Sequence, residues 1–164
     1  MADVNPTAGG SPTGTDDPTA IRIVDFFPHP PAVVWRALTS PELLAQWLMP
    51  NDFEPVVGHR FTFRSQPVGA TRYSGVTKCE VLELREPELL VISWEDESDE
   101  NDMQTKVTFR LEAHDGGTRL SLVQEGFREG HPNDQMARKI MGGGWAGHLL
   151  RRLGELLDAG ATAL

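Results

Sequence analysis

Apolar and polar residues alternate along six short runs of the chain, and this pattern predicts six β-strands. Phe61 and Phe63 share one face of their run, because side chains two residues apart point to the same side of a strand. Asp115-Gly116-Gly117 predicts a tight hairpin turn, since glycine adopts positive φ at little cost. Short connections predict an antiparallel sheet with one buried face. The runs cover residues 21–27, 60–65, 72–84, 89–94, 103–111 and 119–124.

The run at residues 72–84 does not keep a single alternation, which predicts a bulge or bend inside that strand.

Two short helices are predicted between the first two strands, within the segment PHPPAVVWRALTSPELLAQW at residues 28–47. Apolar residues at positions 33, 34, 37 and 38 share one side of the first helix. Ser40 suits the N-cap of the second helix because its hydroxyl accepts hydrogen bonds from the free amides of the next turn. Pro41 suits the first helical position, which needs no amide donor. We expect this helix pair to close one end of the domain.

A long amphipathic helix is predicted from Asn133, a good N-cap residue, to about Ala159. It is the only segment large enough to cover the buried face of the predicted sheet. Its apolar residues recur mainly at intervals of three and four: Met136, Ile140, Met141, Trp145, Leu149, Leu150, Leu153, Leu156 and Leu157.

Four glycines interrupt the middle of this helix, at positions 142, 143, 144 and 147. Each costs about 1 kcal/mol relative to alanine within a helix. One interpretation is a kink or break where the backbone presses against a strand. The other is that the missing side chains leave room for a ligand beside the sheet. The two interpretations are compatible.

Length and charge limit the classes of partner. The 164 residues suit one ordinary domain with its own core. The formal net charge is -9, whereas binding to nucleic acid depends largely on clustered Lys and Arg. No apolar run reaches the roughly 20 residues of a membrane helix. We therefore predict neither nucleic-acid binding nor membrane insertion.

The chain starts without the basic and apolar segments of a signal peptide, and Cys79 has no second cysteine for a disulfide. We therefore expect a cytoplasmic location. Residues 1–19 are rich in Gly, Pro, Thr, Ser and Asp and are predicted to form a disordered tail, with a single domain over residues 20–160.

No pattern of catalytic or metal-binding residues stands out. No pair of histidines has the i, i+4 spacing of a helical metal site. Cys79 lies in a predicted strand without a signal for a nearby base. The acidic run EDESDEND at residues 95–102 lacks the glycine and the final glutamate of a calcium loop and is interpreted as a solvated hairpin loop. We predict no catalytic residue, no metal and no cofactor.

Several segments together resemble the family of proteins similar to activators of the ninety-kilodalton heat-shock-protein ATPase, within the SRPBCC or START-like superfamily. The resemblance covers roughly residues 21–159. The order and spacing of the segments carry it: VVWRALTSPELLAQW, VGHRFTF, YSGVTKCEVLELREPELLVISW, GGTRLSLVQEGF and the GW...LL..L pattern from Gly144 to Leu153.

The resemblance implies an α+β helix-grip (START-like) fold, in which a curved six-stranded antiparallel sheet wraps around the long C-terminal helix and two short helices close one end. Members of the superfamily bind lipids, hormones, polyketides or other hydrophobic molecules between sheet and helix, and some add catalysis. We expect a pocket of several hundred cubic ångströms, on the usual scale of ligand sites.

The function favoured by the sequence is therefore binding of a small hydrophobic molecule without catalysis. Ordinary core packing is the competing explanation for every apolar candidate. Tyr73 and Gln124 are polar on an inward face and need a hydrogen-bond partner, which a ligand, water or the backbone could supply. The predicted lining is Phe61, Phe63, Tyr73, Trp94, Phe109, Leu122, Gln124, Met141, Trp145 and Leu149.

The sequence also allows two other functions. The resemblance allows a protein-interaction module with a chaperone as partner, although the eukaryotic cochaperone uses a separate N-terminal domain for which this chain is expected to have no room. A cyclase or aromatase would need a titratable group in the cavity. The residues that could supply one are Glu80, Glu83, His59 and Tyr73.

Overall fold

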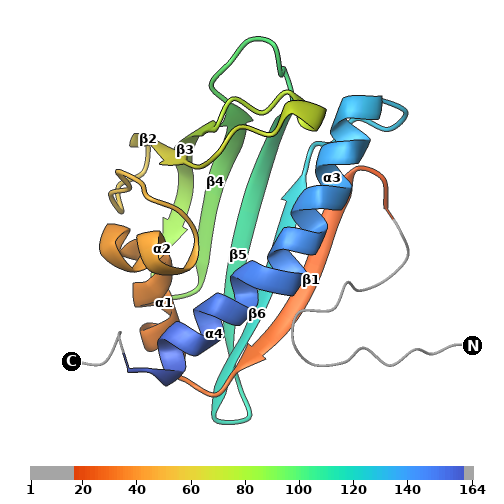
Figure 1. Ribbon diagram of the computed structural model, residues 1–164. Helices are drawn as coiled ribbons and strands as arrows, with labels where there is room; N and C mark the ends of the chain where they lie inside the picture. Colours follow the sequence, from red (N-terminus) through yellow and green to blue (C-terminus); the bar gives the residue numbers. More distant parts are fainter. Residues whose placement is uncertain (1–16, 161–164) are drawn as a thin grey trace, which may run out of the picture.

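The computed structural model describes residues 17–160, and a curved antiparallel sheet of six strands forms its framework (Figure 1). The strand order is β1-β6-β5-β4-β3-β2, so the first strand pairs with the last and β1 and β2 form the two edges. The strands are β1 (Ala20–Phe27), β2 (Arg60–Arg64), β3 (Val76–Arg85), β4 (Leu89–Asp96), β5 (Gln104–His114) and β6 (Gly117–Glu125).

A helical segment of 27 residues lies across the concave face of the sheet, and two short helices lie at one end (Figure 1). The long segment consists of α3 (Pro132–Gly144), a π-helical turn η2 (Trp145–Leu149) and α4 (Leu150–Asp158). The other helices are α1 (Pro31–Thr39), α2 (Pro41–Trp47) and the 3-10 turn η1 (Gly69–Thr71). This arrangement confirms the predicted helix-grip fold.

Helices α1 and α2 begin where their prolines and Ser40 predict. Pro31 and Pro41 occupy the first turns of α1 and α2, and the Ser40 hydroxyl accepts a hydrogen bond of 3.3 Å from the amide of Leu43. The buried Trp47 indole donates to the Ala37 carbonyl at 2.9 Å, which joins the two helices. Together they pack against α4 and close one end of the sheet (Figure 1).

Strand β3 is shorter than predicted, but the bulge is confirmed. The register against β4 shifts between Val81 and Glu83, which leaves Leu82 as the extra residue. The predicted start at Arg72 is wrong, because Arg72 and Gly75 have φ of 61° and 97° and β3 begins only at Val76. A Cβ at Gly75 would lie 2.9 Å from the Ser65 carbonyl oxygen, so this turn requires glycine.

The hairpin between β5 and β6 turns on Asp115 and Gly116, as predicted. Their φ angles are 48° and 78°, and β6 begins at Gly117. Two central residues with positive φ match the twist of the paired strands.

The π-turn explains how the long helix keeps its apolar face on the sheet. Before the turn, Ala137, Met141 and Trp145 follow one another at four-residue steps; the next buried position, Leu150, is five residues after Trp145. A π-turn absorbs that extra residue. The same phase leaves Met136 and Ile140 exposed, although they were predicted on the apolar face.

The start of the long helix also differs from the prediction. His131, not Asn133, is the N-cap, and Pro132 occupies the first helical position. The His131 Nδ1 atom accepts a hydrogen bond of 3.2 Å from the Asp134 amide. The imidazole therefore takes the role that a shorter polar side chain usually has.

The predicted N-terminal tail, residues 1–19, lies mostly outside the described residues. Residues 17–19 are described and contact the domain. The Pro18 carbonyl accepts a hydrogen bond of 2.8 Å from Gln135 Nε2, and the Thr19 carbonyl accepts one of 3.0 Å from the Gly126 amide.

Candidate functional site

A cavity of about 230 Å³ lies between the concave face of the sheet and α3. It is smaller than the several hundred cubic ångströms expected from the sequence, but far larger than one water molecule. Its walls are formed by β3 and β4, the loop that contains η1, the loop between β4 and β5, and α3 with η2. The lining is largely apolar, so the space is a candidate binding site for a hydrophobic molecule.

Aromatic and sulfur-containing side chains form most of the walls. The ring centroids of Trp94 on β4 and Trp145 on η2 lie 5.7 Å apart, which links the sheet wall to the helix wall. Three methionines, Met49, Met103 and Met141, also line the cavity. Methionine adapts its shape and contacts aromatic rings favourably, so such walls suit a planar apolar ligand.

Five of the ten predicted lining residues border this cavity, and five do not. Tyr73, Trp94, Met141, Trp145 and Leu149 line it. The remaining five are buried in the hydrophobic interior and are absent from its lining: Phe61, Phe63, Phe109, Leu122 and Gln124. Strand alternation placed these five correctly on the inward face, but it does not show which part of that face the helix leaves open.

Gln124 is buried with its polar atoms bonded to other side chains. Its Oε1 atom accepts from the Trp145 indole at 2.9 Å, and its Nε2 atom donates to the Thr105 hydroxyl at 3.0 Å. Its Nε2 atom also lies 3.7 Å from the Met141 sulfur. The Gln124 side-chain amide therefore fixes the orientation of Trp145, although Gln124 itself does not line the cavity.

One end of the cavity is polar and centres on two hydroxyl groups. The Tyr73 hydroxyl oxygen lies 2.9 Å from the Thr77 Oγ1 atom, and both residues line the cavity. Thr77 is 2% exposed and shares the inward face of β3 with Cys79. Burial raises the pKa of the Tyr73 hydroxyl, although its bond to Thr77 opposes this effect. The phenol therefore stays protonated at neutral pH.

A buried carboxylate beside these hydroxyls is fully bonded to the protein. Asp96 accepts hydrogen bonds from the Ser74 amide at 2.9 Å, from the Ser74 hydroxyl at 2.5 Å and from the Ser98 amide at 2.9 Å. Asn101 Nδ2 lies 3.4 Å from its Oδ2 atom. Asp96 therefore fastens the loop before β3 to the loop after β4.

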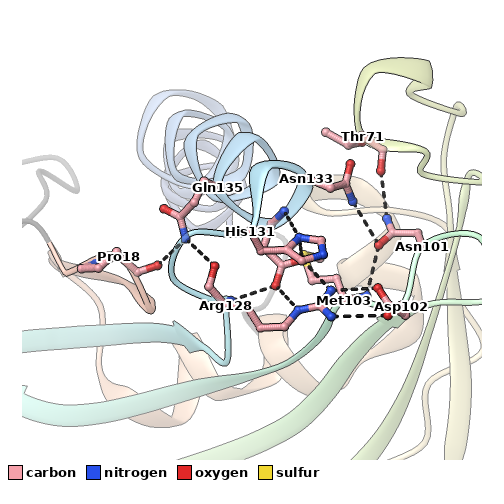
Figure 2. A network of polar contacts seen from close by, with 10 residues as sticks. Pro18, Thr71, Asn101, Asp102, Met103, Arg128, His131, Asn133 and Gln135 are labelled. Atoms are coloured by element: carbon pink, nitrogen blue, oxygen red, sulfur yellow. Dashed lines mark hydrogen bonds and ion pairs between the residues drawn. The ribbon is translucent and has the colours of Figure 1, made fainter.

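Asn101 ties the η1 loop to the rest of the cavity rim (Figure 2). Its Nδ2 atom donates to the Thr71 carbonyl at 3.1 Å, and its Oδ1 atom accepts from the Met103 amide at 3.2 Å. Asn133 Nδ2 on α3 lies 3.4 Å from the same Oδ1. The interpretation of residues 95–102 as a solvated loop is therefore wrong for Asp96 and Asn101, which are 6% and 4% exposed.

An ion-pair network holds the start of α3 beside this rim (Figure 2). The guanidinium of Arg128 contacts the fully buried Asp134 through Nε at 2.9 Å and Nη2 at 3.0 Å, and it contacts Asp102 through Nη2 at 2.8 Å. Burial alone would raise the pKa of Asp134, but the hydrogen bonds and charge of Arg128 outweigh burial and lower it. Asp134 is therefore ionised at neutral pH and anchors α3.

The cavity contains little of the chemistry that catalysis would need. Of the titratable candidates Glu80, Glu83, His59 and Tyr73, only Tyr73 lines it. Burial raises the pKa of the Cys79 thiol, so this cysteine is not activated. Among residues 17–160, no group of three His, Cys, Asp or Glu side chains is arranged to hold a metal ion. No helix in the same range is long and apolar enough to cross a membrane.

Sequence reasoning found Tyr73 but missed the other polar residues at this end of the cavity. Thr77 has the same strand parity as Cys79 and Val81, and this parity was a signal that it faces inward. Asp96 and Asn101 had no such signal, because they stand in an acidic run whose composition is typical of solvated loops.

Comparison with known proteins supports the same fold. The sequence profile of the family described as "Activator of Hsp90 ATPase homolog 1-like protein" matches residues 28–158. Protein MLL2253 from Mesorhizobium loti is 35% identical, with 85% of this chain and 97% of that chain covered and a TM-score of 0.74. A protein from Rhodobacter sphaeroides is 26% identical, with 89% and 96% covered and a TM-score of 0.67.

A third solved structure is DynU16, described as a putative protein in the dynemicin biosynthetic locus. It is 19% identical, with 87% of this chain and 48% of that chain covered and a TM-score of 0.69. At this identity the likeness concerns the fold alone. A search of curated proteins found no match.

Proposed function

The chain belongs to the family of activator of Hsp90 ATPase homolog 1-like proteins, and from this membership we propose that it binds a small hydrophobic molecule between the sheet and α3 without converting it. The fold of this family commonly binds hydrophobic ligands. The observation that carries the proposal is the cavity of about 230 Å³ with walls of Trp, Met and Ile side chains. A concave, mostly apolar pocket with a few polar groups is the usual form of a small-molecule site.

Physical chemistry favours an organic occupant over water. Water in a cavity needs two to four polar partners, and an apolar cavity of about 150 Å³ accepts benzene. The larger cavity here therefore suits a molecule of roughly one or two rings. Most of its polar lining groups are already bonded to other protein groups.

Gly144 provides a direct test, because it lines the cavity and a Cβ built on it would meet nothing within 4 Å. We expect Gly144→Leu to weaken the binding of 2-naphthol, a two-ring probe, by about tenfold or more, since the new side chain competes for the same space. The dissociation constant is measured by isothermal titration calorimetry.

Gly143→Leu is the matched control. Gly143 is exposed, borders no part of the cavity and also has an open Cβ position. Both substitutions replace a helical glycine with a stronger helix former, so neither should lower the melting temperature. Equal binding by both variants and the wild type, or no binding of any two-ring probe, would contradict the proposed function.

A protein-interaction role related to chaperone activation stays a prediction from the family relationship. It is tested by whether the acidic chain captures a purified chaperone at low ionic strength and loses it when salt is added.

A further inference from the structure

We infer that the molecule held in this cavity carries a neutral hydrogen-bonding group, a hydroxyl or a carbonyl, that contacts the Tyr73 and Thr77 hydroxyls, and that anionic ligands are excluded. The inference rests on the proposed function and narrows the class of ligand. It follows from the charges, the unused hydrogen-bonding capacity and the position of the polar end.

The charges around the cavity disfavour a carboxylate or phosphate. Its lining includes two acidic residues, Glu95 and Asp96, and no Lys, Arg or His. An anion entering this space would lose its hydration shell without a cationic partner, which is costly. It would also meet the negative charge of Asp96, whereas the Glu95 side chain lies beside Lys78 on the other face of the sheet.

A cationic ligand is also disfavoured, because both carboxylates are already engaged. Asp96 accepts hydrogen bonds from Ser74 and Ser98 at 2.5–2.9 Å. Glu95 is half-buried and lies 3.9 Å from the Lys78 ammonium. Neither carboxylate is left as an unpaired partner for an amine.

Hydrogen-bonding capacity remains at Tyr73 and Thr77. The two hydroxyl groups have two hydrogens, and their mutual contact of 2.9 Å uses one of them. No other partner of either hydroxyl occurs within residues 17–160. One O–H donor and spare acceptor lone pairs are therefore available to a ligand at the cavity wall.

Two other buried polar residues of the lining, Asn101 and Thr71, lack this capacity, and Ser65 is exposed to solvent. Asn101 uses its amide donors on Thr71 and Asp96 and its oxygen on Met103. The Thr71 hydroxyl donates to the Val68 carbonyl at 3.3 Å. A ligand with an apolar ring between Trp94 and Met141 and one neutral polar group at Tyr73 would match the apolar walls and the unused hydroxyl capacity.

Isosteric naphthalene probes test the inference at pH 7 with the full chain. The neutral 2-naphthamide is compared with 2-naphthoate and with the protonated amine 2-naphthylmethylammonium, and 2-naphthol is compared with 2-methylnaphthalene. We expect the amide to bind at least about tenfold more tightly than either ion. Dissociation constants are measured by isothermal titration calorimetry.

Variants identify the hydroxyl contact. Tyr73→Phe is expected to raise the dissociation constant of 2-naphthol about fivefold to tenfold, the scale of one hydrogen bond. The dissociation constant of 2-methylnaphthalene should change by no more than about twofold. Thr77→Val should act in the same direction. The matched control is Thr108→Val on β5, whose side chain is absent from the cavity lining.

The outcomes separate the inference from the proposed function. Naphthoate or the amine binding as tightly as naphthamide would overturn the inference and leave the proposed function intact. If Tyr73→Phe weakens the binding of 2-naphthol and of 2-methylnaphthalene equally, the inference is also overturned, because the hydroxyl then contributes no specific contact. If none of the five probes binds, the proposed function fails and the inference fails with it.

Discussion

Replacing Trp145 with alanine is expected to lower the free energy of unfolding by about 3–5 kcal/mol, the usual cost of deleting a buried tryptophan side chain. Trp145 is 1% exposed, and its ring centroid lies 5.7 Å from that of Trp94 and 6.0 Å from that of Phe109. Its deletion would also leave the buried Gln124 Oε1 atom without the indole donor.

Urea denaturation measures this effect, and Trp145→Phe is the informative companion. Phenylalanine keeps a ring between sheet and helix but lacks the N–H donor, so its cost should fall clearly below that of alanine. A loss of less than about 1 kcal/mol for the alanine variant would contradict the view that Trp145 joins the two walls.

Replacing Asp134 with alanine is expected to lower the free energy of unfolding by about 2–3 kcal/mol at pH 7, because hydrogen bonds between charged groups are lost at a buried site. Asp134 is fully buried and accepts from the Arg128 amide at 2.8 Å as well as from its guanidinium. Arg128 is half-exposed and retains Asp102, so the remaining cation is not left buried without a partner. The cost should therefore be below that of an isolated buried ion pair.

The pH dependence gives this prediction a second readout. The pKa of Asp134 is lower in the folded chain than in the unfolded chain, so its contribution is present above about pH 4 and is lost as pH falls through the folded pKa. The difference in unfolding free energy between wild type and Asp134→Ala should be constant near neutral pH and shrink in acid. Asp102→Ala, at a mostly exposed carboxylate, is the control and should cost much less.

A pH-independent difference would show that Asp134 acts through packing alone.

Much of the fold was predictable because its signals are local. Ser40 with Pro41, the Asp115-Gly116 turn and the alternation of Leu90, Ile92 and Trp94 each depend on a few neighbouring residues. The errors arose where distant segments decide the outcome. The start of β3 depends on the close approach of Gly75 to the Ser65 carbonyl, which strand propensity does not reveal.

The candidate site was less predictable than the fold. Only residues in one part of the sheet–helix interface border the cavity. Which residues these are depends on the side chains that the long helix turns toward the sheet before and after the π-turn. The glycines were predicted either to press against a strand or to leave space. The α-helix is indeed interrupted there, by the π-turn at Trp145–Leu149. A Cβ at Gly143, Gly144 or Gly147 would meet nothing within 4 Å, so these three do not press against a strand.

The methionines offer the most direct test of ligand binding in this cavity. Met49, Met103 and Met141 line it, whereas Met136 is 45% exposed and does not. With the methionine methyl groups labelled with carbon-13, nuclear Overhauser contacts from bound 2-naphthol report which methyl groups it touches. We predict contacts to Met49, Met103 and Met141 and none to Met136. Contacts to Met136 alone, or saturable binding without contact to the three lining methyl groups, would contradict the account.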